Sequence, residues 1–230
     1  MAFVPPPASR QLLQGVDFSI AVNTAPQAKE RYDAFDRTGT QDPNKCKALL
    51  QFPNRGPVFW SSKMAVDADG PAAGPGLPDG KRLDPGSGQA DTTLHFADGG
   101  GLPSATIPYI VLPQGQSGKP FHPDLAIGDL AVVIFGDKIA AAVCGDLGPV
   151  KKIGEASIGV HELLRQPGVP DPCKTRDANG NCLRIRNASV GGNVLYFVFP
   201  NSSIARSFTK ANAESKIAEA LVLYDRFRSA

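Results

Sequence analysis

The chain lacks any apolar run long enough to cross a membrane as a helix, which excludes a helical membrane protein. It also lacks the glycine motifs of Walker and Rossmann nucleotide sites. Histidine is scarce, with three residues in 230, and none of them has the spacing of metal ligands. The formal net charge of +2 gives no case for nucleic-acid binding. We therefore expect no membrane, nucleic acid, metal or cofactor as a partner.

Glycine and proline are plentiful, with 24 and 21 residues. They lie between short apolar runs rather than in one block, which predicts many turns between strands. The apolar share of 42% and the charged share of 20% are ordinary for a globular protein. Residues 1–10 are rich in proline, so we expect them to form a flexible segment. Because no internal linker is visible, we expect residues 11–230 to form a single domain.

The apolar runs predict a mainly-β domain with a few helices. Strands are predicted at 58–66, 92–96, 106–112, 130–135, 139–144 and 194–199. Helices are predicted at 157–165 and 211–227, and a further helix could lie within 11–32. The turn "FGDK" between two of these strands predicts a hairpin, and "GPAAGPGLPDGKRLDPGSGQ" predicts a long loop of the kind that often borders a binding site.

Acidic residues are concentrated in the middle of the chain. Between Met64 and Gly148 there are ten acids, all of them Asp, and four bases, so this window has a net charge of −6. The remainder must then carry +8, since +2 minus −6 is +8. Asp favours turns, so the window could be a loop-rich region with solvated acids. The functional alternative is an acidic cleft for a cationic ligand.

Four cysteines and the N-terminal residues leave the cellular compartment open. Cys173 and Cys182 flank a turn-like loop that could bring them within disulfide range, whereas Cys46 and Cys144 could be a second pair or two buried thiols. The start "MAFVPPPASR" has neither the basic nor the apolar region of a signal peptide. Either the protein is not exported by that route, or the chain is a mature form restarted with Met.

Two acids each follow a glycine in "CGDLGPVKKIGEASIG". Asp146 is expected at a strand end, facing a cleft, with Gly145 allowing either the close approach of a bulky ligand or an unusual backbone angle. Glu155 is expected in the first turn of the next helix. Each could be structural, Asp146 as a turn acid and Glu155 as a helix cap. Together they suggest the pair that hydrolysis of a glycosidic bond needs, one acid to protonate the leaving oxygen and one base or nucleophile.

Other catalytic patterns are weaker. Ser157 stands one residue out of register for a G-x-S-x-G nucleophile elbow, and "DADG" lacks the third acidic position and the distal Glu of a calcium loop. The histidines His95, His122 and His161 are more typical of packing or surface positions than of ligands. The carboxylate pair is therefore the best indication of chemistry.

Five segments in order resemble the chitosanases of glycoside hydrolase family 75. They are "FWSSKMAVDADG", "LDPGSGQADTTL", "IPYIVLP", "GDLGPVKKIGEAS" and "VLYFVFPNS", and they span residues 59–202. The resemblance implies a six-stranded double-psi-type β-barrel with flanking helices and long loops. It also implies an endo-hydrolase that cuts β-1,4-linked glucosamine chains with inversion. We further expect a secreted monomer. On the basis of the resemblance, Glu155 is predicted to be the general acid and Asp146 the base that activates water, with their carboxyl groups about 6.5–9.5 Å apart.

The resemblance also implies substrate contacts. Asp67 and Asp69 match the family pattern M-x-[IV]-D-x-D-G, and carboxylates there would meet the ammonium groups of chitosan. The structural alternative is that Asp69 builds a turn with the next glycine and Asp67 caps it. Lys63 and Tyr109 are candidates for lining the cleft, Tyr109 by stacking on a sugar, although each could equally be packing.

The chain departs from the family at two places. Ala68 stands where fungal members usually have cysteine, and the loop "LGPVKK" is shorter and carries Lys151 and Lys152. These lysines would repel glucosamine if they faced the cleft. One alternative is therefore a hydrolase of another amino-sugar polymer, such as peptidoglycan, whose peptide carboxylates would suit the lysines. The other is a polysaccharide-binding barrel without turnover.

Overall fold

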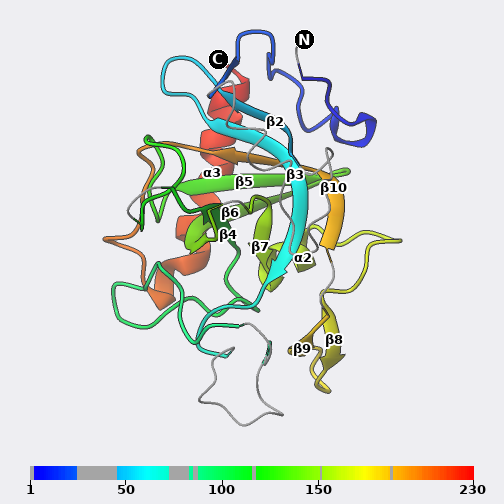
Figure 1. Ribbon diagram of the computed structural model, residues 1–230, viewed down its shortest axis with the longest axis vertical. Coiled ribbons are helices and arrows are strands. Elements are labelled where there is room, and N and C mark those ends of the chain that lie inside the picture. Colours follow the sequence, from blue (N-terminus) through cyan, green and yellow to red (C-terminus); the bar gives the residue numbers. More distant parts are fainter. Residues whose placement is uncertain are drawn as a thin grey trace.

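The computed structural model describes residues 3–24, 46–72, 83–84, 88–115, 118–150, 152–186 and 189–230. Its main sheet has the strand order β1-β2-β3-β10-β5-β6-β4-β7 (Figure 1). The strands are β1 (Val22–Asn23), β2 (Cys46–Gln51), β3 (Val58–Asp67), β4 (Tyr109–Pro113), β5 (Leu130–Phe135), β6 (Lys138–Gly148), β7 (Glu155–Ser157) and β10 (Ser189–Val198). The α-helices are α2 (Ile158–Leu163) and α3 (Ala213–Arg228), and 3-10 turns η1 (Pro7–Ser9) and η4 (Lys210–Asn212) accompany them.

A further pairing of β7 with β3 closes six of these strands into a barrel. Around the ring, β3–β7 and β4–β6 are parallel, and the other four contacts are antiparallel. The predicted mainly-β fold with a six-stranded barrel and flanking helices is therefore confirmed. The hairpin at "FGDK" is also confirmed, because Phe135 pairs with Lys138 across that turn.

Strand β5 is buried on both faces of the barrel wall, which explains its continuous apolar run, "LAVVIF". Inside the barrel, Trp60 stacks on Tyr196 with their ring centroids 5.1 Å apart. Small side chains such as Ala131 and Ala142 belong to the same buried cluster. They leave room for the two large rings, as close packing at native density requires.

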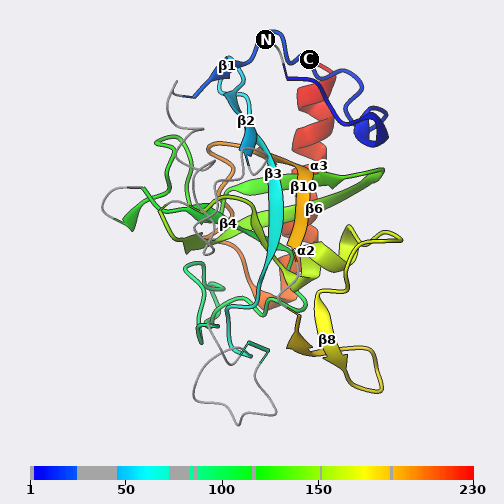
Figure 2. The ribbon, with the colours of Figure 1, turned by 45° about the vertical axis from the view of Figure 1, so that its right-hand side comes forward.

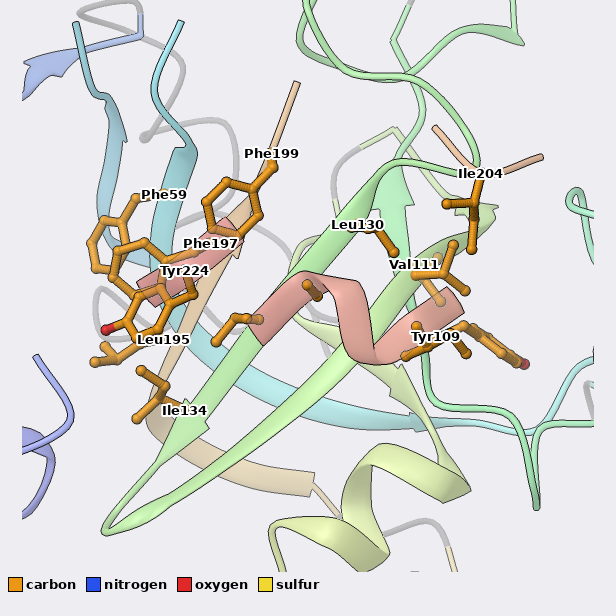
Figure 3. Packing of buried hydrophobic residues seen from close by; sticks show 14 of the residues in the cluster. Phe59, Tyr109, Val111, Leu130, Ile134, Leu195, Phe197, Phe199, Ile204 and Tyr224 are labelled. Atoms are coloured by element: carbon orange, nitrogen blue, oxygen red, sulfur yellow. The ribbon is translucent and has the colours of Figure 1, made fainter. Parts of the chain in front are cut away.

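The outer face of the barrel packs against helix α3, which lies behind the strands in Figure 1. Figure 3 shows Phe59, Phe197 and Tyr224 together in this outer cluster, with centroid distances of 4.8 Å from Phe59 to Phe197 and 5.1 Å from Phe197 to Tyr224. Buried side chains of α3 recur at Ile217, Ala220 and Tyr224, which is helical spacing. The prediction of a C-terminal helix is confirmed.

The N-terminal segment lies against the C-terminal end of α3 (Figure 2), since a Cβ on Gly15 would lie 2.1 Å from the Arg228 carbonyl oxygen. Tyr224 donates a hydrogen bond to the Leu12 carbonyl at 3.0 Å. The ring of Phe3 lies 5.0 Å from those of Phe18 and Phe59, a contact that the Pro-rich composition did not predict.

Two predicted elements differ in the structure. Residues 92–96 do not form a strand, because the Thr92 hydroxyl donates to the Leu94 carbonyl and accepts from the Leu102 amide, which ties the segment into a turn. Residues 11–24 form turns and the short β1 rather than a helix. Gly15, at φ +91°, interrupts any helix there, and the rest of that prediction lies outside the described residues.

A second, two-stranded sheet of β8 (Cys173–Arg176) and β9 (Cys182–Ile185) carries a disulfide between Cys173 and Cys182. Cys46 and Cys144 are two buried thiols rather than a disulfide pair, which decides between the two alternatives for them. The hairpin lies at the end of the barrel where β3 ends (Figures 1 and 2). Among the described residues, no helix is both long and apolar enough to span a bilayer.

Candidate active site

Asp146 and Glu155 lie on two strands that flank a third. In the register of the sheet, Val111 of β4 pairs with Glu155 of β7 on one side and with Asp146 of β6 on the other. Neighbouring strands lie about 4.8 Å apart, so the Cα atoms of the two acids are separated by about 10 Å. Both residues are largely buried, with 7% of Asp146 and 6% of Glu155 exposed. The fold therefore brings the two predicted catalytic acids together, with Val111 of the intervening strand β4 between them.

A β-bulge at Gly145 decides which way Asp146 faces. The neighbours Ile110 and Val111 pair with Cys144 and Asp146, so Gly145 is an extra residue in β6. Cys144 faces the barrel interior, and strict alternation would turn Asp146 inward as well. The bulge instead places Asp146 level with Val111 on the outer face.

The structure corrects two expectations about this segment. Asp146 lies within β6, which continues to Gly148, rather than at the end of the strand. A Cβ on Gly145 would lie 2.6 Å from the Tyr109 Cβ, so the glycine permits close packing against Tyr109 rather than the approach of a ligand.

Glu155 is in β7 and not in the first turn of a helix, which corrects a third expectation. Helix α2 begins after Ser157, whose hydroxyl accepts a hydrogen bond from the Val160 amide. Gly154 precedes Glu155 with φ +81°, and its carbonyl accepts from the Ala65 amide at 2.9 Å. This backbone contact joins β7 to β3 and fixes the position of Glu155 in the wall.

Thr93 holds the carboxylate of Asp146. Its amide and its hydroxyl donate to Asp146 Oδ1 at 3.0 and 2.5 Å, and the Leu147 amide donates to the same oxygen at 2.8 Å. Burial raises the pKa of Asp146, and these three donors act against that effect. Sequence reasoning placed Thr93 in a strand and missed this role, although the "TTL" of the second matching segment marked the position.

Thr93→Val is expected to raise the pKa of Asp146 further, because it removes the hydroxyl donor. In the base role predicted for Asp146 the carboxyl must be ionised. The acidic limb of the kcat/KM profile should then move upward by about 1 pH unit, given that a hydrogen bond to a charged group contributes about 1.5–3 kcal/mol. Thr106→Val, at an exposed hydroxyl, is the control. A pH profile that superimposes on that of the parent would refute the role of Thr93.

Asp67 and Asp69 approach the same wall from the end of β3. Asp67 lies two residues after Ala65, the register partner of Glu155, so it shares a face with Glu155. Carboxylate oxygens of Asp67, Asp69 and Asp146 lie within 4.8 Å of one another. The structure therefore brings together all four predicted acids.

The same two acids also build the turn, as the structural alternative proposed. Asp67 Oδ1 accepts from the Asp69 amide at 2.8 Å, and Asp69 Oδ1 accepts from the Gln89 amide at 2.7 Å. The Tyr109 hydroxyl donates to the Asp69 carbonyl at 2.9 Å. Asp67 and Asp69 can build the turn and also lie beside Asp146, because each carboxylate uses only Oδ1 in the turn hydrogen bonds given above and has a second oxygen, Oδ2.

Burial and mutual repulsion disfavour the ionised forms of these acids. Burial, followed by the charge of Asp69, raises the pKa of Asp67 well above its ordinary value. Burial, with help from Asp146 and Glu155, raises the pKa of Asp69 to about 6. A cation placed among them would relieve both effects, and either an ammonium group or a metal ion could serve.

A second group of possible ligands consists of Glu162, Asp171 and Cys173. It is less suited to a metal, since the Cys173 sulfur is in the disulfide. Arg176 also donates to both Glu162 and Asp171, so these carboxylates already have a cationic partner.

Asp69→Asn is expected to raise the free energy of unfolding at pH 7. The Asp69 carboxyl has a pKa of about 6 in the folded chain and 3.8 in the unfolded chain. At a pH between these two values, folding is therefore accompanied by uptake of a proton at Asp69. The stabilisation of the fold by the protonated Asp69 carboxyl is present in full below pH 3.8 and is lost as the pH rises through 6. The variant should therefore lose less stability than the parent between these two pH values.

Urea unfolding at several pH values, with parent and Asp69→Asn compared at each, measures this difference. Burial lowers the pKa of His161 to about 4, so this residue makes the fold more stable as the pH rises from 4 to 6.5. This effect is the same in both proteins and cancels in the comparison. Parallel stability curves for the two proteins would contradict the prediction.

The other two predicted substrate contacts, Tyr109 and Lys63, are both buried. Tyr109 is fully buried, so it has no exposed face on which a sugar could stack, and it serves instead to support Asp69 and Gly145. Lys63 is also buried on β3, and its carbonyl accepts from the Tyr196 hydroxyl at 3.0 Å.

Of the two lysines in the β6–β7 loop, only Lys152 is among the described residues. Lys152, whose orientation the sequence left open, contacts Glu155 Oε1. Lys151 lies outside the described residues.

No family model matches the chain, and no curated protein shows significant similarity to it in sequence.

Proposed function

We propose that the chain is a glycoside hydrolase of chitosanase type that cuts β-1,4-linked glucosamine polymers by single displacement. The observation that carries this proposal is the register Glu155–Val111–Asp146, which places two buried carboxylates about two strand spacings apart on one wall. Such a spacing is compatible with the 6.5–9.5 Å separation typical of inverting enzymes, which leaves room for a water molecule. The resemblance to family 75 in the two motifs that carry these acids supports the same chemistry.

Asp146 is the proposed general base. The three described donors to its carboxylate all contact Oδ1, which leaves Oδ2 to take a proton from water. The water oxygen then bonds to the anomeric carbon as the glycosidic carbon–oxygen bond breaks. Glu155, on the far side of Val111, gives its proton to the leaving oxygen. One proton enters the protein at Asp146 and one leaves from Glu155, so a proton exchange with solvent restores the starting state.

Asp67 and Asp69 are the proposed binding groups for the substrate amine. Burial and the neighbouring acids raise the pKa of both carboxyls, so a bound cation would stabilise their ionised forms. A glucosamine ammonium supplies that cation, whereas N-acetylglucosamine brings no charge. Binding of chitosan should therefore be favoured over binding of chitin.

Release of reducing ends from highly deacetylated chitosan, compared with chitin and purified peptidoglycan, tests this function. We expect release from chitosan and little from chitin. Release from peptidoglycan alone would instead support a hydrolase of that polymer. Binding of chitosan without release of any reducing ends would contradict the enzymatic proposal and support a polysaccharide-binding barrel.

A further inference from the structure

The β8–β9 hairpin packs against the turn that carries Asp67 and Asp69. Ala68 stands between these two acids, and only 4% of it is exposed. It is part of a buried apolar group, which we call the hairpin cluster and which consists of Ala68, Leu83, Ile158 and Cys173. Cys182 and Ile185 of β9 also pack against this group. Both strands of the hairpin therefore contribute to the cluster that buries Ala68.

Side chains at the end of β3 alternate between the hairpin and the acidic site. Val66 and Ala68 both belong to the packing of the hairpin cluster, so they face the hairpin. Asp67 stands between them and points to the opposite face, which it shares with Glu155. Burial of Ala68 on one face therefore fixes the direction of the Asp67 carboxylate on the other.

The two strands of the hairpin are attached to different parts of the domain. Strand β8 is attached to helix α2, because the Arg176 guanidinium forms an ion pair with Glu162 of that helix. Strand β9 is attached to Leu83, whose carbonyl accepts a hydrogen bond from the Ile185 amide at 2.9 Å. The Leu83 amide in turn donates to the Ala72 carbonyl at 3.1 Å, shortly after the acidic turn. The hairpin thus connects α2 with the segment that continues from that turn.

The Cys173–Cys182 disulfide joins these two attached strands. The pairing between β8 and β9 is irregular, because its register shifts both between Cys173 and Thr175 and between Thr175 and Arg176. A two-stranded hairpin is marginally stable at best without further support. The disulfide supplies that support, since it keeps the strand that contacts α2 beside the strand that contacts Leu83.

We propose that the disulfide-linked β8–β9 hairpin positions the Asp67–Asp69 turn, and through it the binding site for the substrate amine. The part of this inference that concerns the substrate rests on the proposed function. The hairpin holds Ala68 from one face, and Asp67 holds Asp69, because Asp67 Oδ1 accepts from the Asp69 amide at 2.8 Å. When the hairpin loosens, the turn moves toward solvent, and the two carboxylates no longer meet one ammonium group together.

The two proposed catalytic acids are held by other contacts. Thr93 holds the Asp146 carboxylate, and the hydrogen bond from the Ala65 amide to the Gly154 carbonyl holds the strand of Glu155. Loss of the hairpin contact should therefore weaken binding of the substrate more than the chemical step. Kinetically, this appears as a rise in KM with little change in kcat.

The double variant Cys173→Ala with Cys182→Ala tests the inference by kinetics. Its KM for fully deacetylated chitosan should rise by about tenfold, which is the effect of losing one contact to a charged group, while kcat stays nearly unchanged. Ile217→Ala is the control for a general loss of stability, because it removes a buried side chain of α3 from the other end of the core. It should leave KM unchanged. A double variant with the KM of the parent would overturn the inference, whatever its kcat.

Arg176→Met is a milder variant, which keeps the disulfide and removes the attachment of β8 to α2. It should raise KM in the same direction. Arg228→Met is its matched control, because Arg228 forms an ion pair with Asp225 on the surface of α3 and should leave KM unchanged. If the double cysteine variant does not fold, Arg176→Met decides the outcome, and the KM of the parent in this variant would overturn the inference.

Carbon NMR of the Asp69 carboxyl gives a readout that needs no turnover. Burial is the largest cause that raises the pKa of Asp69 to about 6. The charged groups that face it are Asp67, Asp84, Asp146 and Glu155. A turn that moves toward solvent loses both the burial and part of this repulsion. The pKa of Asp69 should therefore fall toward 3.8 in the double cysteine variant, or in Arg176→Met, and stay the same in Ile217→Ala.

The NMR titration separates failure of this inference from failure of the proposed function. The same pKa of Asp69 with and without the hairpin contacts would overturn the inference even if the parent hydrolyses chitosan. A lower pKa in the variant, found for a parent that does not hydrolyse chitosan, would support the positioning of the turn and refute only the proposed function.

Discussion

Glu155→Gln and Asp146→Asn are each expected to lower chitosan hydrolysis by at least about 10²–10⁴-fold while the protein stays folded. Gln and Asn keep the size and one acceptor oxygen of the original side chains, so the hydrogen bonds from Thr93 and Leu147 to position 146 can persist. What is lost is the proton donor at position 155 and the proton acceptor at position 146. Release of reducing ends, with circular dichroism to check folding, measures both effects.

Matched controls separate catalytic loss from a general effect of removing an acid. Asp137→Asn changes an exposed acid in the turn before β6, and Glu219→Gln changes an exposed acid on α3. Neither should lower activity. If Glu155→Gln or Asp146→Asn kept more than about a tenth of the parent rate, the pair could not supply general acid and base catalysis of the usual size.

The two variants should also differ from each other on an activated substrate. An aryl glycoside of a glucosamine oligomer has a leaving group that departs without protonation, so Glu155→Gln should recover much of its activity on it. Asp146→Asn should remain inactive, because water still needs its base. The opposite pattern would reverse the two assigned roles.

Gly154→Ala is expected to lower the free energy of unfolding by about 2–4 kcal/mol, the sum of two effects. The first is backbone strain, since Gly154 has φ +81° and a side chain there disfavours the left-handed region. The second is a steric clash, because the new Cβ would lie 2.2 Å from the Lys63 carbonyl oxygen. Relief of this clash must separate β7 from β3, so Glu155 should also shift and activity should fall.

Gly168→Ala is the matched control for backbone strain. Gly168 has a similar φ of +83°, but nothing lies within 4 Å of an added Cβ. This variant should lower stability by only about 1–2 kcal/mol and leave activity unchanged. Urea denaturation of both variants measures the difference. Equal losses of stability would show that β3 and β7 do not approach as closely at Gly154 as the structure indicates.

The long apolar elements could be predicted from the sequence because their patterns are local. The β5–β6 hairpin, β10 and α3 each have enough residues to show a strand or helix pattern. β7 has only three residues, too few to show an alternating pattern, so the sequence predicts Glu155 as part of the following helix instead. Thr92 and Thr93 favour strands by residue type, but their hydroxyls form tertiary hydrogen bonds that determine the local structure instead.

The two acids at the centre of the site could be found from the sequence, but their geometry could not. Their motifs identified Asp146 and Glu155, and charge counting identified the acidic region. The face that Asp146 occupies depends on the bulge at Gly145, which only the pairing with β4 reveals. The contact of Lys152 with Glu155 depends likewise on how the loop folds back over β7.

Proton NMR of the first products formed from a glucosamine oligomer tests the paired carboxylates most directly. Attack of water from the side opposite the leaving group inverts the anomeric carbon, so a β-1,4 linkage should give the α anomer first. The β anomer should appear only later, by mutarotation. Initial formation of the β anomer would contradict single displacement by Asp146 and Glu155, because retention requires a covalent intermediate and carboxyl groups only about 5–5.5 Å apart.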